Sequence, residues 1–204
     1  MYPGERLNSI THLVATALAV VGAAVLVWRV AGQDDPWKIA GVVLFGVGLV
    51  ALYSASTLYH AIRGPLKALF RRADHAAIFL LIAGTYAPFA LGPLRGTLGW
   101  ALFTIVWAMA VVGIWQAMRR RPEQDPSPVP HLVMGWLGAA ALFPLIKALG
   151  PYGAAWLAIG GLMYTIGVVF YVNDRRWRHA HGVWHLFVMA GSGSHFVAVL
   201  YFVA

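Results

Sequence analysis

Seven apolar runs, each about as long as a helix that crosses a bilayer, dominate this chain of 204 residues. Such a helix needs about 20 mostly apolar residues. The runs cover approximately residues 10–30, 37–60, 73–92, 97–118, 131–149, 152–172 and 181–204. Seven spans would use about 140 positions, which leaves only short links and tails. We therefore expect residues 1–204 to form a single seven-helix transmembrane domain, with no separate soluble domain.

The composition agrees with a membrane protein rather than a soluble one. Hydrophobic residues make up 60% of the chain and charged residues only 11%, whereas a soluble domain carries about 25% charged residues. Only helices and closed barrels satisfy their backbone hydrogen bonds in hydrocarbon. A barrel needs alternating segments of about ten residues, and the sequence has none. The expected fold class is therefore an all-α integral membrane bundle.

The basic residues predict the orientation of this bundle. Eleven of the fifteen fall on one side of the predicted spans: Arg6, Arg63, Lys67, Arg71, Arg72, Arg119, Arg120, Arg121, Arg175, Arg176 and Arg178. The positive-inside rule then places the N-terminus in the cytoplasm and the C-terminus outside. The net charge of +8 is accounted for by anionic lipid and topology, so we expect no nucleic-acid partner.

The histidines gather at one end of the predicted bundle. Five of them begin runs that enter from the cytoplasmic side: His12, His75, His131, His181 and His185. His60 ends a run on that side, and His179 lies in a cytoplasmic link. His195 is deeper, roughly 15 Å beyond His185 at 1.5 Å per residue.

Three of these histidines predict a metal site. His181 and His185 are four residues apart, so both imidazoles leave the same face of a helix. His60 supplies a third imidazole at the matching depth. Three neutral imidazoles with an open fourth position are typical of catalytic zinc, and the absence of cysteine excludes thiolate ligands. Two imidazoles on one helix cannot sandwich a haem, so zinc is the expected cofactor.

Two further residues at this level are the predicted catalytic groups. Asp74 opens the third run and is the most plausible carboxylate inside the membrane, where ionisable groups mark function. It would accept a proton from water or orient that water. Ser56 lies one turn deeper than His60 on the same helix face and would hold an imidazole or the water.

The remaining polar residues receive simpler interpretations. We expect His12, His75, His131 and His179 to be interfacial residues or hydrogen-bond partners, and His195 to bond across helices or line a cavity. Glu5, Asp125 and Asp174 are expected to be solvated flanking charges. Because polar residues open the first run, we interpret it as a retained span rather than a secretory signal.

These motifs together resemble the haemolysin III family, the bacterial branch of the progestin and adipoQ receptor superfamily. The matching stretches occur in the family's order: Glu5-Arg-Leu-Asn8-Ser-Ile-Thr-His12, Ser56-Thr-Leu-Tyr-His60, Ala73-Asp74-His75 with Gly84-Thr-Tyr-Ala-Pro88, and His181-Gly-Val-Trp184-His185 through Gly191 to His195. The resemblance implies a seven-helix, adiponectin-receptor-like bundle in the bacterial inner membrane. It also implies zinc on His60, His181 and His185, with Asp74 and Ser56 beside it.

Three functions remain open from the sequence. The leading hypothesis is a zinc-dependent, ceramidase-like hydrolase of a lipid amide or ester, which the wider superfamily suggests, with a membrane lipid as substrate. The second is a sensor or homeostasis protein in which zinc is structural. The third is a haemolysin-like pore, although few polar residues occur in the outer halves of the spans to line one.

Overall fold

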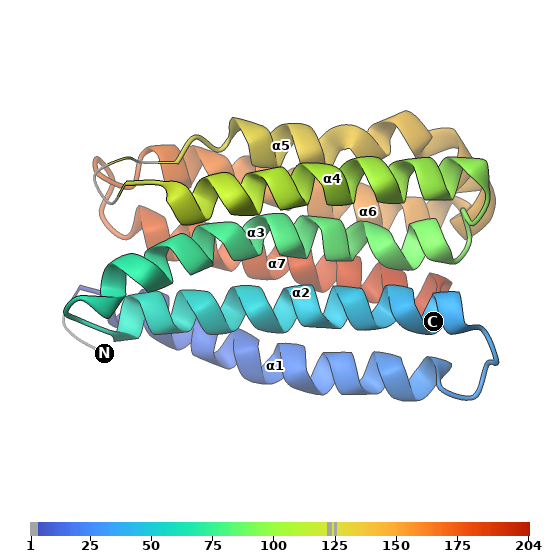
Figure 1. Cartoon of the computed structure of the whole chain (residues 1–204), viewed down its shortest axis with the longest axis horizontal. Coiled ribbons are helices and arrows are strands. Elements are labelled where there is room, and N and C mark those ends of the chain that lie inside the picture. Colours follow the sequence, from blue (N-terminus) through green and yellow to red (C-terminus); the bar gives the residue numbers. More distant parts are fainter. Residues whose placement is uncertain (1–3, 122–123, 125) are drawn as a thin grey trace.

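The computed structural model describes residues 4–121, 124 and 126–204, and the regular structure of these residues is entirely helical (Figure 1). The elements are α1 (Arg6–Val30), α2 (Pro36–Ala61), α3 (Leu66–Leu91), α4 (Thr97–Arg119), α5 (Val129–Trp136), the 3-10 helix η1 (Leu137–Ala141), α6 (Leu142–Val172) and α7 (Ala180–Phe202). The expected all-α architecture is therefore confirmed.

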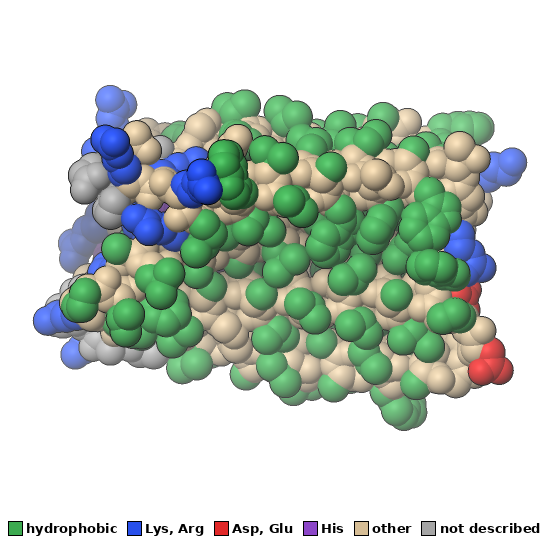
Figure 2. Space-filling model, viewed as in Figure 1, with side chains coloured by type: hydrophobic (Ala, Val, Ile, Leu, Met, Phe, Trp, Pro, Cys, Tyr) green, Lys and Arg blue, Asp and Glu red, His purple; other side chains and the backbone are tan. Residues whose placement is uncertain are grey.

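The outer surface of the bundle is that of a protein in lipid. Within the described residues, six helical segments are long and apolar enough to cross a membrane. Large apolar side chains such as Trp28 and Phe143 are 78% exposed. Figure 2 shows apolar side chains covering the middle of the bundle, with Lys and Arg gathered mainly at one end. These features define an integral membrane protein.

The segment Val129–Val172 departs most from a simple span. It is 44 residues long, or about 66 Å at 1.5 Å per residue, roughly twice the thickness of a bilayer core. Gly150 interrupts the helix with φ 71° and ψ 173°, a backbone conformation that glycine adopts without strain. The break coincides with the predicted end of the fifth run at residue 149.

The close packing of α2 against α3 brings together the two helices that carry the predicted catalytic residues. A Cβ added to Gly84 would lie 2.7 Å from the Leu44 carbonyl oxygen, and one added to Gly41 would lie 2.9 Å from that of Ala87. Small residues at such crossings let helix backbones approach each other in membranes. The helix α3 also begins at Leu66, earlier than the expected residue 73, so its first turns include Arg71.

The start of α1 and the end of α7 lie at opposite ends of the bundle (Figure 1). The first turns of α1 and α7 lie side by side, since the rings of His12 and His185 stack with their centroids 3.6 Å apart. This shared end of the bundle is where the last turn of α2 and the start of α3 also meet.

Candidate metal centre

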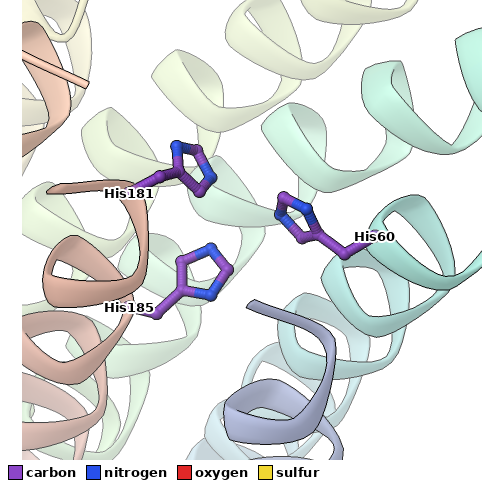
Figure 3. Close-up of side chains that lie close together, drawn as sticks. All are labelled: His60, His181 and His185. Carbon is purple, nitrogen blue, oxygen red and sulfur yellow. The ribbon is translucent and has the colours of Figure 1, made fainter. Parts of the chain in front are cut away.

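Three imidazoles, which we call the imidazole cluster, converge from two helices (Figure 3). His60 comes from the last turn of α2, and His181 and His185 come from the start of α7. One ligand atom from each lies within 4.8 Å of the others. A tetrahedral zinc ion bound at about 2.0–2.1 Å separates its nitrogen ligands by roughly 3.3 Å. Small ring rotations would therefore let all three side chains hold one metal ion.

The second nitrogen of each ring already has an oxygen partner. His60 Nδ1 lies 2.6 Å from Glu5 Oε2, and His181 Nδ1 lies 3.3 Å from Asp174 Oδ2. A carboxylate oxygen accepts, so both Nδ1 atoms donate, and in the neutral form of each ring the Nε2 atom is then free to bind a metal. The Nε2 atom of His60 is buried and has no hydrogen-bond partner among the described residues. A free Nε2 opposite a carboxylate-bound Nδ1 is the usual arrangement of a metal-binding histidine.

The third ring follows the same pattern with a hydroxyl. His185 Nδ1 lies 3.5 Å from Thr11 Oγ1. The Thr11 hydroxyl lies 2.8 and 3.0 Å from the Leu7 and Asn8 carbonyl oxygens, and when it donates its one hydrogen to either of them it accepts from His185 Nδ1. All three rings therefore present the same kind of atom to the centre, and the donor set suits a divalent metal such as zinc.

The expectation of a solvated flanking charge is wrong for Glu5, whereas Asp174 is exposed in the link before α7 as expected, although it also contacts His181. The start of α1 brings Glu5 against His60, Asn8 and Lys67. Burial raises the pKa of Glu5, but hydrogen bonds with His60 and Asn8 and the charge of Lys67 outweigh it, and the net pKa is about 2. Glu5 is therefore ionised at neutral pH. Asp125, the third of these expected charges, lies outside the described residues.

Asp74 and Ser56 lie beside the imidazole cluster. Both are buried, and the Asp74 carboxyl is near the Ser56 hydroxyl and the His60 ring. Ser56 Oγ makes no hydrogen bond of good geometry with any described residue, so it is available to a ligand or to water. The structure thus brings both residues to the centre, while their catalytic role stays a prediction.

A cavity of about 310 Å³ opens from this level into the bundle. Asp74, Ser56 and the two α7 imidazoles line one end of it, and apolar residues such as Phe89 line most of the rest. A cavity of this size falls within the range of small-ligand sites. An apolar cavity ending at polar groups suits the chain of an amphiphile whose headgroup meets the metal centre.

The other histidines agree with the roles expected from the sequence to different degrees. His195 hydrogen-bonds to the Leu157 carbonyl at 3.1 Å and lines the cavity, as expected. His179 is exposed in the link before α7. His12 is buried and stacks on His185, but neither of its nitrogens has a hydrogen-bond partner among the described residues. The role of hydrogen-bond partner expected for His12 is therefore not seen within the bundle.

Fold and site together define a multi-pass helical membrane protein with a histidine cluster that could hold a metal ion. The family described as haemolysin-III related matches residues 2–196. The chain belongs to the haemolysin III family.

Individual relatives support this assignment over nearly the whole chain. The "Hemolysin-3 homolog" of Bacillus subtilis (strain 168) is 39% identical over 97% of this chain and 93% of its own length. "Hemolysin-3" of Bacillus cereus is 37% identical over 98% and 91%. The human "Monocyte to macrophage differentiation factor" is 32% identical over 94% of this chain and 81% of its own length.

Proposed function

We propose that this protein is a zinc-dependent hydrolase of a lipid amide or ester. The observation that carries the proposal is the imidazole cluster, in which three Nδ1 atoms have oxygen partners and the opposite nitrogens face one another beside a buried carboxyl. When bound, zinc supplies Lewis acidity that polarises an acyl carbonyl and makes water more acidic near neutral pH. The three histidines would hold it, as the donor set described above indicates.

The chain's own residues supply the remaining steps of hydrolysis. The Asp74 carboxylate accepts a proton from the attacking water and then delivers it to the leaving group. The Ser56 hydroxyl is close enough to hydrogen-bond to that carboxylate or to the water and so fixes its position. The apolar cavity holds the acyl chain, which positions the scissile bond at the polar end and limits the access of bulk water.

The topology proposed with this function places the site at the cytoplasmic face of a bacterial inner membrane. The end of the bundle that holds the imidazole cluster also holds most of the basic residues, which favours a cytoplasmic location. We propose that Val129–Val172 crosses the membrane twice, with the reversal at Gly150. Seven crossings then put the C-terminus outside.

One carboxyl substitution, with a histidine substitution as control, tests the catalytic proposal. The purified protein should contain about one zinc ion per chain by elemental analysis. Asp74→Asn should keep this zinc and reduce the release of fatty acid from a lipid amide or ester by at least about a hundredfold. The control His179→Asn changes an exposed histidine near the site and should retain full activity. A zinc-loaded wild-type protein that hydrolyses none of a panel of lipid amides and esters would contradict the proposal.

One observation favours a second function, in which the metal is structural. The cluster joins α2 to α7, although α7 packs mainly against α6 and α1. A bound ion would therefore fasten together two helices that have little direct contact. This alternative predicts that chelation lowers the melting temperature strongly, while Asp74→Asn leaves function in cells intact. Loss of function in the Asp74→Asn variant at unchanged stability would favour the hydrolase instead.

A further inference from the structure

The cavity contains a second group of polar residues that the metal centre does not use. His75 of α3 and His131 of α5 both line it. The His131 ring stacks on Phe79, with the ring centroids 4.0 Å apart. Its Nε2 atom is buried and has no hydrogen-bond partner among the described residues. A buried polar atom without a partner is costly and rare, and one on a cavity wall can be satisfied by a ligand.

The charged side chains near these two histidines include two arginines. Arg71 of α3 and Arg120 at the end of α4 both act electrostatically on His75, and Arg120 acts on His131 as well. Arginines and histidines are the charged groups that act on the two rings within the described part of the chain, and the nearest carboxyl on the cavity wall is that of Asp74, which belongs to the metal centre. We call His75, Arg120 and His131 the basic cluster. Cationic groups near this part of the cavity wall are complementary to an anion.

We propose that the basic cluster binds the phosphate of an acidic lipid headgroup while the lipid's chain occupies the cavity. Guanidinium groups match phosphate oxygens with paired hydrogen bonds, and His131 Nε2 can supply a further one. A lipid is favoured over free phosphate because the rest of the cavity wall is mostly apolar. The inference rests on the proposed function, since it names the substrate as a phosphate-bearing lipid amide or ester.

Binding of simple amphiphiles tests this inference without any need for catalysis. Isothermal titration of the full-length protein in an uncharged detergent would compare decyl phosphate, decanol and inorganic phosphate. Decyl phosphate should bind at least about tenfold more tightly than either of the others. Arg120→Gln and His131→Gln should each weaken it by about tenfold to a hundredfold, as expected for hydrogen bonds to a charged group.

The matched control is Arg119→Gln. Arg119 is exposed on the same turn of α4, where its guanidinium carbon lies 4.6 Å from the centre of the Trp115 ring. This variant should bind decyl phosphate like the wild type. Arg120 and His131 belong to different helices, so a substitution that unfolds one variant need not unfold the other. Size-exclusion chromatography shows which variant is folded, and decyl phosphate binding by that variant is enough to test the inference.

Three results would overturn the inference. Decanol could bind as tightly as decyl phosphate, or the Arg120 and His131 variants could bind like the wild type. Inorganic phosphate could also bind as tightly as decyl phosphate, which would assign the site to free phosphate and not to a lipid. Zinc content and hydrolysis are measured separately. A protein that binds decyl phosphate but neither contains zinc nor hydrolyses lipids would refute the proposed function alone. A protein that contains zinc and hydrolyses lipids but does not bind decyl phosphate would refute this inference alone.

Discussion

The imidazole cluster and the basic cluster both contribute histidines to the wall of the same cavity, but the surroundings of these histidines differ. In the imidazole cluster, carboxylates accept hydrogen bonds from His60 and His181. In the basic cluster, the groups that act on His75 are arginines and other histidines. A histidine that donates to a carboxylate keeps a free nitrogen for a cation, whereas histidines among arginines attract an anion. The partners of an imidazole, more than the imidazole itself, decide what it binds.

The largest expected effect comes from deleting one imidazole in each cluster. His185→Ala should reduce bound zinc from about one ion per chain to nearly none, because two ligands rarely retain the ion. His131→Ala should leave the zinc content unchanged. Elemental analysis of the two purified variants makes the comparison. Equal loss of zinc from both would show that the two clusters are not distinct.

Removing the carboxylate partners should have the next largest effect. Glu5→Gln should weaken zinc binding by about tenfold to a hundredfold, the usual cost of losing an outer-shell partner. Asp174→Asn should weaken zinc binding less. The Asp174 oxygen lies 3.3 Å from His181 Nδ1, whereas the Glu5 oxygen lies 2.6 Å from His60 Nδ1, and the Asp174 side chain is 34% exposed. Competition against a chelator of known affinity measures both. If Asp174→Asn weakened zinc binding more than Glu5→Gln, Asp174 and not Glu5 would be the more important carboxylate for the metal site.

A substitution between α2 and α3 tests whether their close approach supports both clusters. Gly84→Ala places a methyl group against the Leu44 carbonyl oxygen and should cost about 1–3 kcal/mol of stability, as overpacking does. The control Gly193→Ala adds a methyl group where no atom lies within 4 Å, and it should be neutral or slightly stabilising. Thermal unfolding in detergent measures the difference. An unchanged melting temperature for Gly84→Ala would contradict the packing described here.

The smallest expected effect concerns an ion pair at the opposite end of the bundle. Asp35 accepts hydrogen bonds from the first turn of α2 and lies 2.8 Å from the Arg95 guanidinium. Burial raises the pKa of Asp35, but hydrogen bonds from the Lys38 backbone and from Arg95 outweigh it, so the net pKa lies below its ordinary value of 3.8.

A depressed pKa means that Asp35 stabilises the folded state above its ordinary pKa, and that this contribution is lost as the pH falls through the folded-state value. Asp35→Asn should therefore lower the melting temperature slightly at neutral pH and not at all in strong acid. Thermal scans from about pH 7 to pH 2 measure the difference between variant and wild type. A large difference in melting temperature at neutral pH would contradict the small contribution to stability that we assign to this exposed ion pair.

Much of the candidate site could be read from local spacing along the chain. The interval of four residues between His181 and His185 fixes a shared helix face, and the end of an apolar run places His60 at a similar depth. The structure brings these three side chains together with Asp74 and Ser56. The break near residue 150 was also predicted, because glycine followed by proline interrupts a helix.

The chain's own sequence thus determined its membrane character, its helices and the depth of its histidines, because hydrophobic run length and helical periodicity are local properties. Tertiary structure alone decided that Glu5 and Asp174 hold imidazoles, that His12 stacks on His185, and that Arg120 lies near His75 and His131. Each of these contacts joins different segments of the chain, and the distance between such segments depends on how the helices pack, which no local pattern encodes.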